Sequence, residues 1–310
     1  MKRTSGFNIV VYLSLSETLS LNAPNETNET NSLMETKTMA DTNTARITVA
    51  NQKGGAGKTT DVIHTGGALA ARGYDVLLVD IDYHGGLTCS LGYSDLYYDT
   101  DRTTLFDVLD FDQMESVNDI IVEHEEFDIL PASEKLANNK NIQTLLEAPK
   151  SRERLGMTFD ELDTDYDYII VDTPPSLNVL TDNALVATGN VVIPVIPEKL
   201  NANSLQIFAK QLSSLEPAYG GINRLAIVCN RVEQNAEHRN TLEEIKSAYS
   251  LPVFEIPKRT DLSQSIGKGV SVFGFGKENK RVEDARELFN EIADLLDDTF
   301  EKTPPEEVEA

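Results

Sequence analysis

The sequence predicts an α/β fold with a doubly wound, mostly parallel sheet, and three features of the 310 residues support that prediction. A glycine-rich turn stands between a short β-type run, Ile47–Ala50, and a helical pattern from about Lys58 to Arg72. Two continuous apolar runs, Val76–Val79 and Tyr168–Val171, suit strands that are buried on both faces of a parallel sheet. Beyond them strand and helix signals alternate, as they do when helices cover both faces of such a sheet.

The glycine-rich turn predicts a nucleotide-phosphate loop, and it reads Lys53-Gly54-Gly55-Ala56-Gly57-Lys58-Thr59-Thr60. Glycines let the backbone wrap tightly, so that successive N–H groups point at phosphate oxygens, and the following helix adds its positive N-terminal end. In such a loop Lys58 reaches the β- and γ-phosphates, and the Thr59 hydroxyl binds Mg²⁺. The strict G-x-x-x-x-G-K-[ST] pattern is not met, because Gln52 occupies the place of its first glycine.

Three aspartates stand where two of the predicted strands end. Asp80 and Asp82 close the first apolar run, and Asp172 closes the second, immediately before Thr173-Pro174-Pro175. The carboxyl ends of parallel strands form the ligand edge of a doubly wound sheet, and a carboxylate there can hold Mg²⁺ directly or through water. A single aspartate at a strand end is more often an ordinary turn residue. Two such strands after a phosphate loop favour a metal-nucleotide site.

These three motifs together resemble the deviant Walker A ATPases, and within them the ParA/Soj partition proteins, with MinD a close relative. The resemblance extends from about Arg46 to about Phe300 and implies a P-loop NTPase fold. It also implies that the chain uses ATP and Mg²⁺, hydrolyses ATP to ADP and phosphate at low turnover under partner stimulation, and forms an ATP-dependent homodimer. A centromere- or cargo-binding protein of the ParB type is the implied partner.

The resemblance assigns roles to individual residues. Lys53 of each subunit reaches the phosphates held by the other subunit, and Asp82 positions or deprotonates the attacking water. The implied catalytic residues are thus Lys53, Lys58 and Asp82, and the implied metal ligands are Thr59, Asp80 and Asp172. The implied ATP contacts are Lys53, Gly54, Gly55, Ala56, Gly57, Lys58, Thr59 and Thr60. Asn230 and Pro257 are candidates for the adenine contact, although each also suits a plain strand cap.

The D-x-D segment departs from the family pattern at two positions. The family usually has D-x-D-P-Q-G, whereas this chain has Asp80-Ile81-Asp82-Tyr83-His84-Gly85. His84 is either a water-orienting replacement for the family glutamine or a tolerated loop substitution. The departure bears on the timing of hydrolysis more than on ATP binding.

The charge of the chain is strongly negative, with 51 acidic and 27 basic residues, a net charge of −24 and an isoelectric point near 4.5. We interpret this as adaptation to a salty, halophilic cytoplasm, because net charge keeps a protein soluble when screening is strong. An acidic surface made for a basic partner is the alternative. The two cysteines, Cys89 and Cys229, are far apart and provide no CxxC motif, disulfide framework or Fe–S site, so we expect both to be buried.

Any DNA-binding surface must therefore be a local basic island. The stretch Ile256–Leu262 with Ile266–Gly269 resembles the I-P-x-x-x-x-L…G-K stretch of partition ATPases, in which basic side chains contact DNA phosphates. The candidate residues for this role are Arg239, Lys258, Arg259 and Lys268, with Lys277, Lys280 and Arg281 near them. Ordinary surface charge is the alternative interpretation.

The remaining patterns complete the predicted domain. Strand candidates are Phe127–Leu130, Val191–Val195, Arg224–Cys229 and Val253–Ile256, and helical patterns cover about Glu134–Glu147, Asn201–Leu215, Arg239–Ala248 and Val282–Phe300. The last of these carries one apolar stripe, which we expect to pack against the domain. Its acidic polar face is unlike the basic membrane helix that ends a MinD-type protein.

Three segments are expected along the chain. Residues 1–44 form an N-terminal extension that is disordered or mis-annotated, since Met39 is a natural start, with a targeting segment as the alternative. Residues 45–300 form the ATPase domain, and residues 301–310 form an acidic tail.

The predicted function is a cytoplasmic, nucleoid-associated ATPase that binds DNA non-specifically with ATP and partitions a plasmid or chromosome. A MinD-like membrane-surface regulator and an amidating or carboxylating enzyme of the same fold remain the alternatives.

Overall fold

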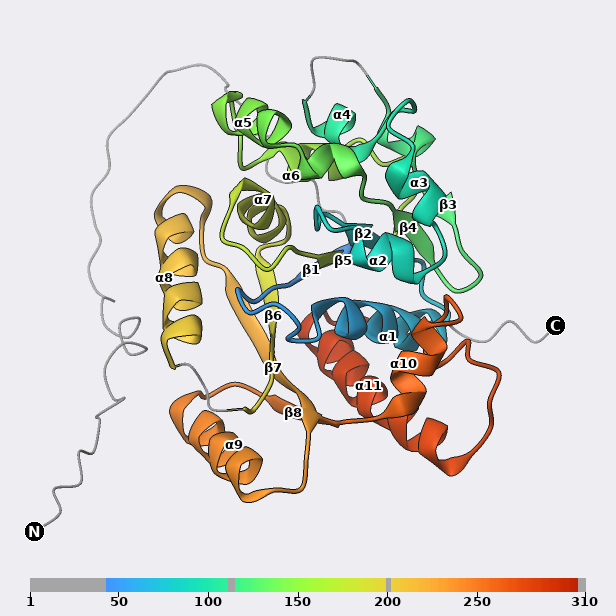
Figure 1. Cartoon of the computed structure of the whole chain (residues 1–310), viewed down its shortest axis with the longest axis vertical. Coiled ribbons are helices and arrows are strands. Elements are labelled where there is room, and N and C mark those ends of the chain that lie inside the picture. The colour runs from blue at the N-terminus through green and yellow to red at the C-terminus, as the bar shows by residue number, and fades with distance from the viewer. Residues whose placement is uncertain (1–42, 111–114, 199–201, 306–310) are drawn as a thin grey trace, which may run out of the picture.

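The computed structural model of the chain describes residues 43–110, 115–198 and 202–305, and these residues hold one eight-stranded sheet (Figure 1). Its strands lie in the order β3-β4-β2-β5-β1-β6-β7-β8. Their bounds are β1 Ala45–Val49, β2 Val76–Asp80, β3 Val122–Glu123, β4 Asp128–Leu130, β5 Tyr168–Asp172, β6 Asn190–Val195, β7 Asn223–Val232 and β8 Val253–Pro257. Most of the expected extension, residues 1–42, and the end of the tail, residues 306–310, lie outside the described ranges.

The sheet is parallel except at one edge, where β3 pairs with β4 antiparallel. Because sequence-adjacent parallel strands need crossovers, helices fill the intervals between them. The helices are α1 Lys58–Ala70, α2 Gly86–Ser90, α3 Ser94–Tyr98, α4 Leu105–Asp110, α5 Asn139–Glu147, α6 Arg154–Phe159, α7 Val179–Thr188, α8 Ala202–Tyr219, α9 Ala236–Ala248, α10 Thr260–Ile266 and α11 Lys280–Thr299, with 3₁₀ turns η1 Val117–Asp119 and η2 Glu134–Ala137. The predicted doubly wound α/β fold is confirmed.

Both faces of the sheet are covered, which explains the continuous apolar strands. Along β5 the side chains of Tyr168 and Ile170 join a core with α1, α10 and α11, whereas Ile169 and Val171 point to the opposite face. On that opposite face α4, α5, α6 and α7 cover one half of the sheet, and α8 and α9 cover the other half. Figure 1 shows α1 beside α11 on one side and α7 on the other. Alternate residues of one strand thus enter different cores.

The last helix packs against the domain, as its apolar stripe predicted. α11 contacts α1, and its buried residues are Val282, Ala285, Phe289, Ile292, Ala293, Leu296 and Asp297. It begins after Asn279, whose side chain accepts hydrogen bonds from the N–H groups of Arg281 and Val282. None of the helices within the described ranges combines the length and apolar character that crossing a bilayer requires.

Several element boundaries differ from the sequence prediction. The helix expected over Glu134–Glu147 is broken at Asn138, whose side chain accepts from the Lys140 N–H and starts α5 there. Strand β7 runs to Val232 rather than Cys229, and α8 continues to Tyr219 with Pro217 in its last turn. The two-residue strand β3 and the short helices between β2 and β4 carry too little periodicity to be recognised.

A buried polar cluster joins α11 to the sheet and to the end of α1. Asp297 is 8% exposed and accepts hydrogen bonds from the Tyr168 hydroxyl and from Arg72, each at 2.6 Å. Arg72 also donates to Asp294 at 2.6 Å and to the Asn290 carbonyl at 2.9 Å. The carboxylate of Asp297 therefore satisfies two donors that have little access to water.

Replacing Asp297 with alanine should destabilise the fold, because the Tyr168 hydroxyl and one Arg72 N–H lose their acceptor. We expect the free energy of unfolding in urea to fall by about 2–3 kcal/mol. The matched control is Asp298→Ala at the exposed neighbouring position, where we expect a change within about 0.5 kcal/mol. Equal unfolding midpoints for the two variants would show that the cluster contributes nothing.

Candidate active site

Three neighbouring strands end together at the edge where the sequence motifs lie. In the pairing of β1, β2 and β5, Asp172 stands opposite both Asp80 and Val49. The chain leaves β1 after Val49 into the glycine-rich turn and enters α1 at Lys58. Residues from distant parts of the sequence are thus brought together because parallel strands share one carboxyl edge.

The glycine-rich turn is held tightly by a residue of β7. The Nδ2 group of Asn230 donates to the Ala56 carbonyl at 3.0 Å, and a Cβ atom on Gly57 would overlap the Asn230 side chain. Gly57 also has φ +103°, a conformation that residues with a side chain rarely adopt. Both constraints require glycine at this position, directly before the first helical residue.

Lys58 is enclosed at the base of the turn. Its side chain is buried, and Nζ donates to the Asn51 carbonyl at 3.4 Å. Burial lowers the pKa of Lys58, while the negative charges of Asp172 and Asp82 act in the opposite direction. The ammonium group therefore lies between the turn and the strand-end carboxylates, as a phosphate-binding lysine requires.

Asp172 and Thr59 form the part of the site that best fits Mg²⁺. The Thr59 hydroxyl donates to Asp172 Oδ2 at 2.6 Å, while Asp172 Oδ1 is buried without a hydrogen-bond donor. Burial and the nearby Asp80 raise the pKa of Asp172 well above its usual range. An oxygen with no donor, beside a hydroxyl and a second carboxylate, matches the ligand preference of a hard divalent cation.

Asp80 differs from Asp172 because the protein already occupies both of its oxygens. Its Oδ2 accepts from the N–H of Thr88 at 2.8 Å and from the Thr88 hydroxyl at 2.7 Å, and its Oδ1 accepts from the Asp82 N–H at 3.1 Å. Burial raises the pKa of Asp80 to about 7. Asp80 thus fixes the segment between β2 and α2, and these donors favour contact with a metal through water rather than directly.

Two of the predicted catalytic groups differ in how far they are exposed to solvent. Asp82 is 8% exposed, and its Oδ1 accepts from the N–H and the ring Nδ1 of His84. Lys53 instead turns outward, with its side chain 44% exposed and Nζ 3.9 Å from Glu198 Oε2. The side chain of Lys53 is thus more accessible from outside the chain than that of Lys58.

Asp61 is a site residue that the sequence analysis missed. It lies in the first turn of α1, is 1% exposed, and accepts from Asn230 Nδ2 at 2.8 Å, while its Oδ1 has no donor. Burial raises the pKa of Asp61 well above its usual range. The acidic residue after G-K-T-T was the available signal, but an acid in the first turn of a helix is common for its dipole alone.

The adenine candidates are placed differently from the sequence expectation. Asn230 lies within β7, two residues before the strand ends, and Pro257 is the last residue of β8. The Asn230 amide donates to Ala56 and to Asp61, so both of its hydrogens are in use. Only the side-chain oxygen of Asn230 remains for a base.

The candidate DNA-binding cations are interleaved with acids. Lys258 forms an ion pair with Glu233 at 3.0 Å, and Arg259 lies 3.8 Å from Asp284. Within the described ranges no carboxylate lies within ion-pair distance of four of the other cations, which are Arg239, Lys268, Lys277 and Lys280. Two of these, Lys268 and Lys277, contact the Phe275 ring. The predicted island is therefore split into a paired part and an unpaired part.

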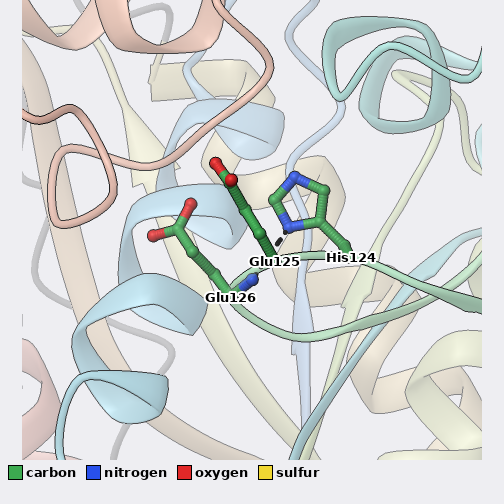
Figure 2. A group of neighbouring side chains, drawn as sticks. All are labelled: His124, Glu125 and Glu126. Carbon is green, nitrogen blue, oxygen red and sulfur yellow. Dashed lines mark hydrogen bonds between the residues drawn. The ribbon is translucent and has the colours of Figure 1, made fainter.

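A second group of ligand-type side chains projects from the turn between β3 and β4, and it is formed by His124, Glu125 and Glu126 (Figure 2). Nδ1 of His124 accepts from the Glu126 N–H, and Nε2 faces the Gly269 carbonyl at 2.8 Å. Glu126 accepts from the N–H groups of Ser271 and Gly274. Since both ring nitrogens are engaged, this group ties the turn to the loop after α10 and does not suit a metal.

A cavity of about 740 Å³ opens beside that turn, between the end of α2 and the loop after α10. Cys89 lines it and is partly exposed, so the expectation that both cysteines are buried was wrong for Cys89 and right for Cys229. The position of Cys89 on the short helix α2, which the sequence did not reveal, explains the difference.

The buried carboxylate of Asp61 should make the free energy of unfolding depend on pH. Because its pKa is raised, the folded chain keeps a proton that the unfolded chain releases above about pH 4. This contribution to stability is present at low pH and is lost as pH rises toward the folded pKa. Asp61→Asn, which mimics the protonated acid, should therefore stabilise the nucleotide-free chain relative to the wild type, and this difference should grow as pH rises above about 4 and level off above the folded pKa of Asp61.

Urea unfolding at several pH values measures this difference. The control is Asp95→Asn on α3, an exposed position where we expect no such growth with pH. Parallel stability curves for Asp61→Asn and the wild type would contradict the assignment of a buried, protonated Asp61.

Comparison with known proteins indicates the same nucleotide-binding site as the geometry does. A sequence profile described as an AAA domain matches residues 44–224. The sporulation initiation inhibitor protein Soj of Bacillus subtilis is 32% identical over 257 residues, which cover 80% of this chain and 97% of Soj. The chromosome partitioning protein ParA of Caulobacter vibrioides is 31% identical over 241 residues, which cover 73% of this chain and 86% of ParA.

A solved structure of similar fold contains the expected ligands. It is described as cobyrinic acid a,c-diamide synthase from Mycobacterium smegmatis with bound ADP and magnesium, with a TM-score of 0.68 and 30% identity. The match covers 84% of this chain and 98% of that one. Together with the phosphate loop and the donor set around Asp172, this supports ATP and Mg²⁺ as the cofactors. The chain belongs to the ParA/Soj family of P-loop ATPases.

Proposed function

We propose that the chain is a partition ATPase that dimerises with ATP, binds DNA non-specifically in that state, and is released from DNA by hydrolysis. The observation that carries the proposal is the contrast within one loop between the exposed side chain of Lys53 and the buried side chain of Lys58. An exposed lysine at the start of the loop is available to the phosphates of a second subunit. The similarity to Soj and to ParA over most of the chain supports the cellular role.

The proposed reaction is in-line attack of water on the γ-phosphoryl group. Thr59 and Asp172, with support from Asp80, would hold Mg²⁺, which would supply positive charge against the phosphates. Lys58 and the partner's Lys53 add positive charge where the transition state carries negative charge. Asp82 orients the water or takes its proton, and a ParB-like protein raises the low rate by stabilising this arrangement.

The DNA contact is proposed for the unpaired part of the basic island. Lys268 is exposed after α10 without an ion-pair partner in the described ranges, and Arg239 is exposed on α9. Lys258 and Arg259 would have to exchange Glu233 and Asp284 for phosphates, which lowers their net contribution. With a net charge of −24, binding is expected only where two copies add their islands together. We place the protein in the cytoplasm, on the nucleoid and in a salt-adapted cell.

Two alternative functions are tested by the DNA-binding and vesicle-binding assay described next. A MinD-like membrane role is disfavoured because α11 is packed on α1 and has an acidic outer face. An amidating enzyme of the same fold is favoured only by the similarity to the cobyrinic acid a,c-diamide synthase of Mycobacterium smegmatis. That enzyme class requires no DNA binding and no ATP-dependent pairing of subunits.

Fluorescence anisotropy with a random-sequence duplex tests the proposal at high potassium. We expect binding with a slowly hydrolysed ATP analogue and Mg²⁺, and no binding with ADP or to anionic lipid vesicles. Lys53→Ala should still bind nucleotide but should lose both the dimer, measured by sedimentation, and DNA binding. Vesicle binding without DNA binding would favour the membrane role. The absence of both DNA binding and vesicle binding would favour the amidating class.

A charge-reversal variant tests where the DNA-binding surface lies. Lys268→Glu should weaken DNA binding about tenfold and reduce its salt dependence while the dimer persists. The control is Lys140→Glu, the same change at an exposed position of α5 on the opposite face of the sheet. Equal affinity for the two variants would place the DNA surface elsewhere.

A further inference from the structure

The segment after β2 contains a side-chain contact that the family pattern does not predict. His84 occupies the place of the family glutamine, yet its ring turns back toward the chain that precedes it. Both the backbone N–H and the ring Nδ1 of His84 lie 2.9 Å from Asp82 Oδ1. The histidine thus meets the proposed catalytic carboxylate directly.

The direction of this hydrogen bond follows from the carboxylate. An ionised carboxylate only accepts, so Nδ1 must carry the hydrogen and donate it to Asp82. In the neutral ring Nε2 is then the unprotonated nitrogen. The side chain of His84 is 60% exposed, whereas that of Asp82 is 11% exposed. The contact therefore ties a surface ring to a carboxylate inside the site.

The neighbouring residues hold His84 in this place. The ring of Tyr83 lies against that of His84, with 4.3 Å between the ring centroids. The Tyr83 carbonyl accepts from the hydroxyl of the buried Tyr97 at 2.7 Å. Gly85 has φ +64°, and a Cβ atom there would overlap the Tyr97 ring, so the backbone on the other side of His84 is also fixed.

The two N–H groups of His84 occupy one oxygen of the Asp82 carboxylate and leave the other oxygen open. Oδ1 of Asp82 is occupied by both His84 groups, whereas Oδ2 has no protein donor in the parts of the chain that the structure describes. A carboxylate that is free to rotate would exchange its oxygens and spread its lone pairs over many directions. Fixing Oδ1 therefore fixes the direction in which Oδ2 accepts from a water molecule.

We propose that His84 is a positioning residue for Asp82, holding Oδ1 through Nδ1 so that Oδ2 is presented to the attacking water. The inference rests on the catalytic role proposed above for Asp82. It differs from the simpler idea that His84 replaces the family glutamine and orients water itself, because that role would use Nε2. In this structure the nitrogen that meets the site is Nδ1.

Two amide substitutions separate these roles by geometry. The amide nitrogen of asparagine is attached to Cγ, as Nδ1 is, whereas that of glutamine is one bond farther out, near the position of Nε2. His84→Asn can therefore keep the hydrogen bond to Asp82, and His84→Gln restores the family residue without it. His84→Ala removes both possibilities.

Single-turnover hydrolysis and ATP affinity are measured for each variant of the full chain. His84→Asn should keep the single-turnover rate constant within about twofold, whereas His84→Gln and His84→Ala should lower it about tenfold. The Kd for ATP should stay unchanged in all three, since an interaction that only positions water acts on the transition state. A control, Asp95→Ala on α3, removes a nearby exposed side chain and should change neither quantity.

The Asp82→Ala background separates failure of this inference from failure of the proposed role of Asp82. In that background His84→Ala should cause no further loss, because its effect passes through the missing carboxylate. Rescue by glutamine but not by asparagine would overturn the inference in favour of direct water orientation. Full activity of His84→Ala beside an inactive Asp82→Ala would overturn it alone, and full activity of Asp82→Ala would overturn both.

Discussion

The architecture of the site depends on one constraint, the burial of acidic side chains around Lys58 at the carboxyl edge of the sheet. Asp80 and Asp172 are paired across β2 and β5, with Asp61 and Asp82 nearby, and Lys58 is the buried cation among them. Burial of ionised carboxylates is costly unless they are paired or bind a cation. The raised pKa values of Asp80 and Asp172 are the consequence in the metal-free chain. Mg²⁺ is the cation that would compensate the excess of buried acidic groups over Lys58.

The surrounding residues hold this edge in place before any ligand arrives. Thr88 fixes Asp80 from α2, and Asn230 connects the glycine-rich turn to Asp61 from β7. His84 fixes the one carboxylate that lies near the mouth of the site. The Asp80 and Asp82 contacts are local to the segment after β2, whereas the Asn230 contacts join β7 to the turn before α1 and therefore depend on tertiary packing. Such preorganised polar groups are more effective in catalysis than groups that must be reoriented during the reaction.

Much of this arrangement could be predicted from the sequence, because its signals are local. The apolar runs indicated strands buried on both faces, and the glycine-rich turn placed Lys58 at the start of a helix. The contacts between distant segments could not be predicted in the same way. Nothing in the order of residues indicates that Asn230 donates to both Ala56 and Asp61, or that Glu233 and Asp284 pair with two of the candidate DNA-binding cations. Those contacts depend on how β7, α10 and α11 pack, which short-range periodicity does not encode.

We infer that the buried acids require Mg²⁺ before the phosphates of ATP can enter. The most direct test of this inference is the thermal unfolding midpoint of the wild-type chain with ATP, measured in Mg²⁺ and in EDTA at the same potassium concentration. We expect a clear rise in the midpoint with ATP and Mg²⁺ together, and almost none with ATP in EDTA, because the phosphates then meet the buried acids without a cation. An equal rise in EDTA would contradict it.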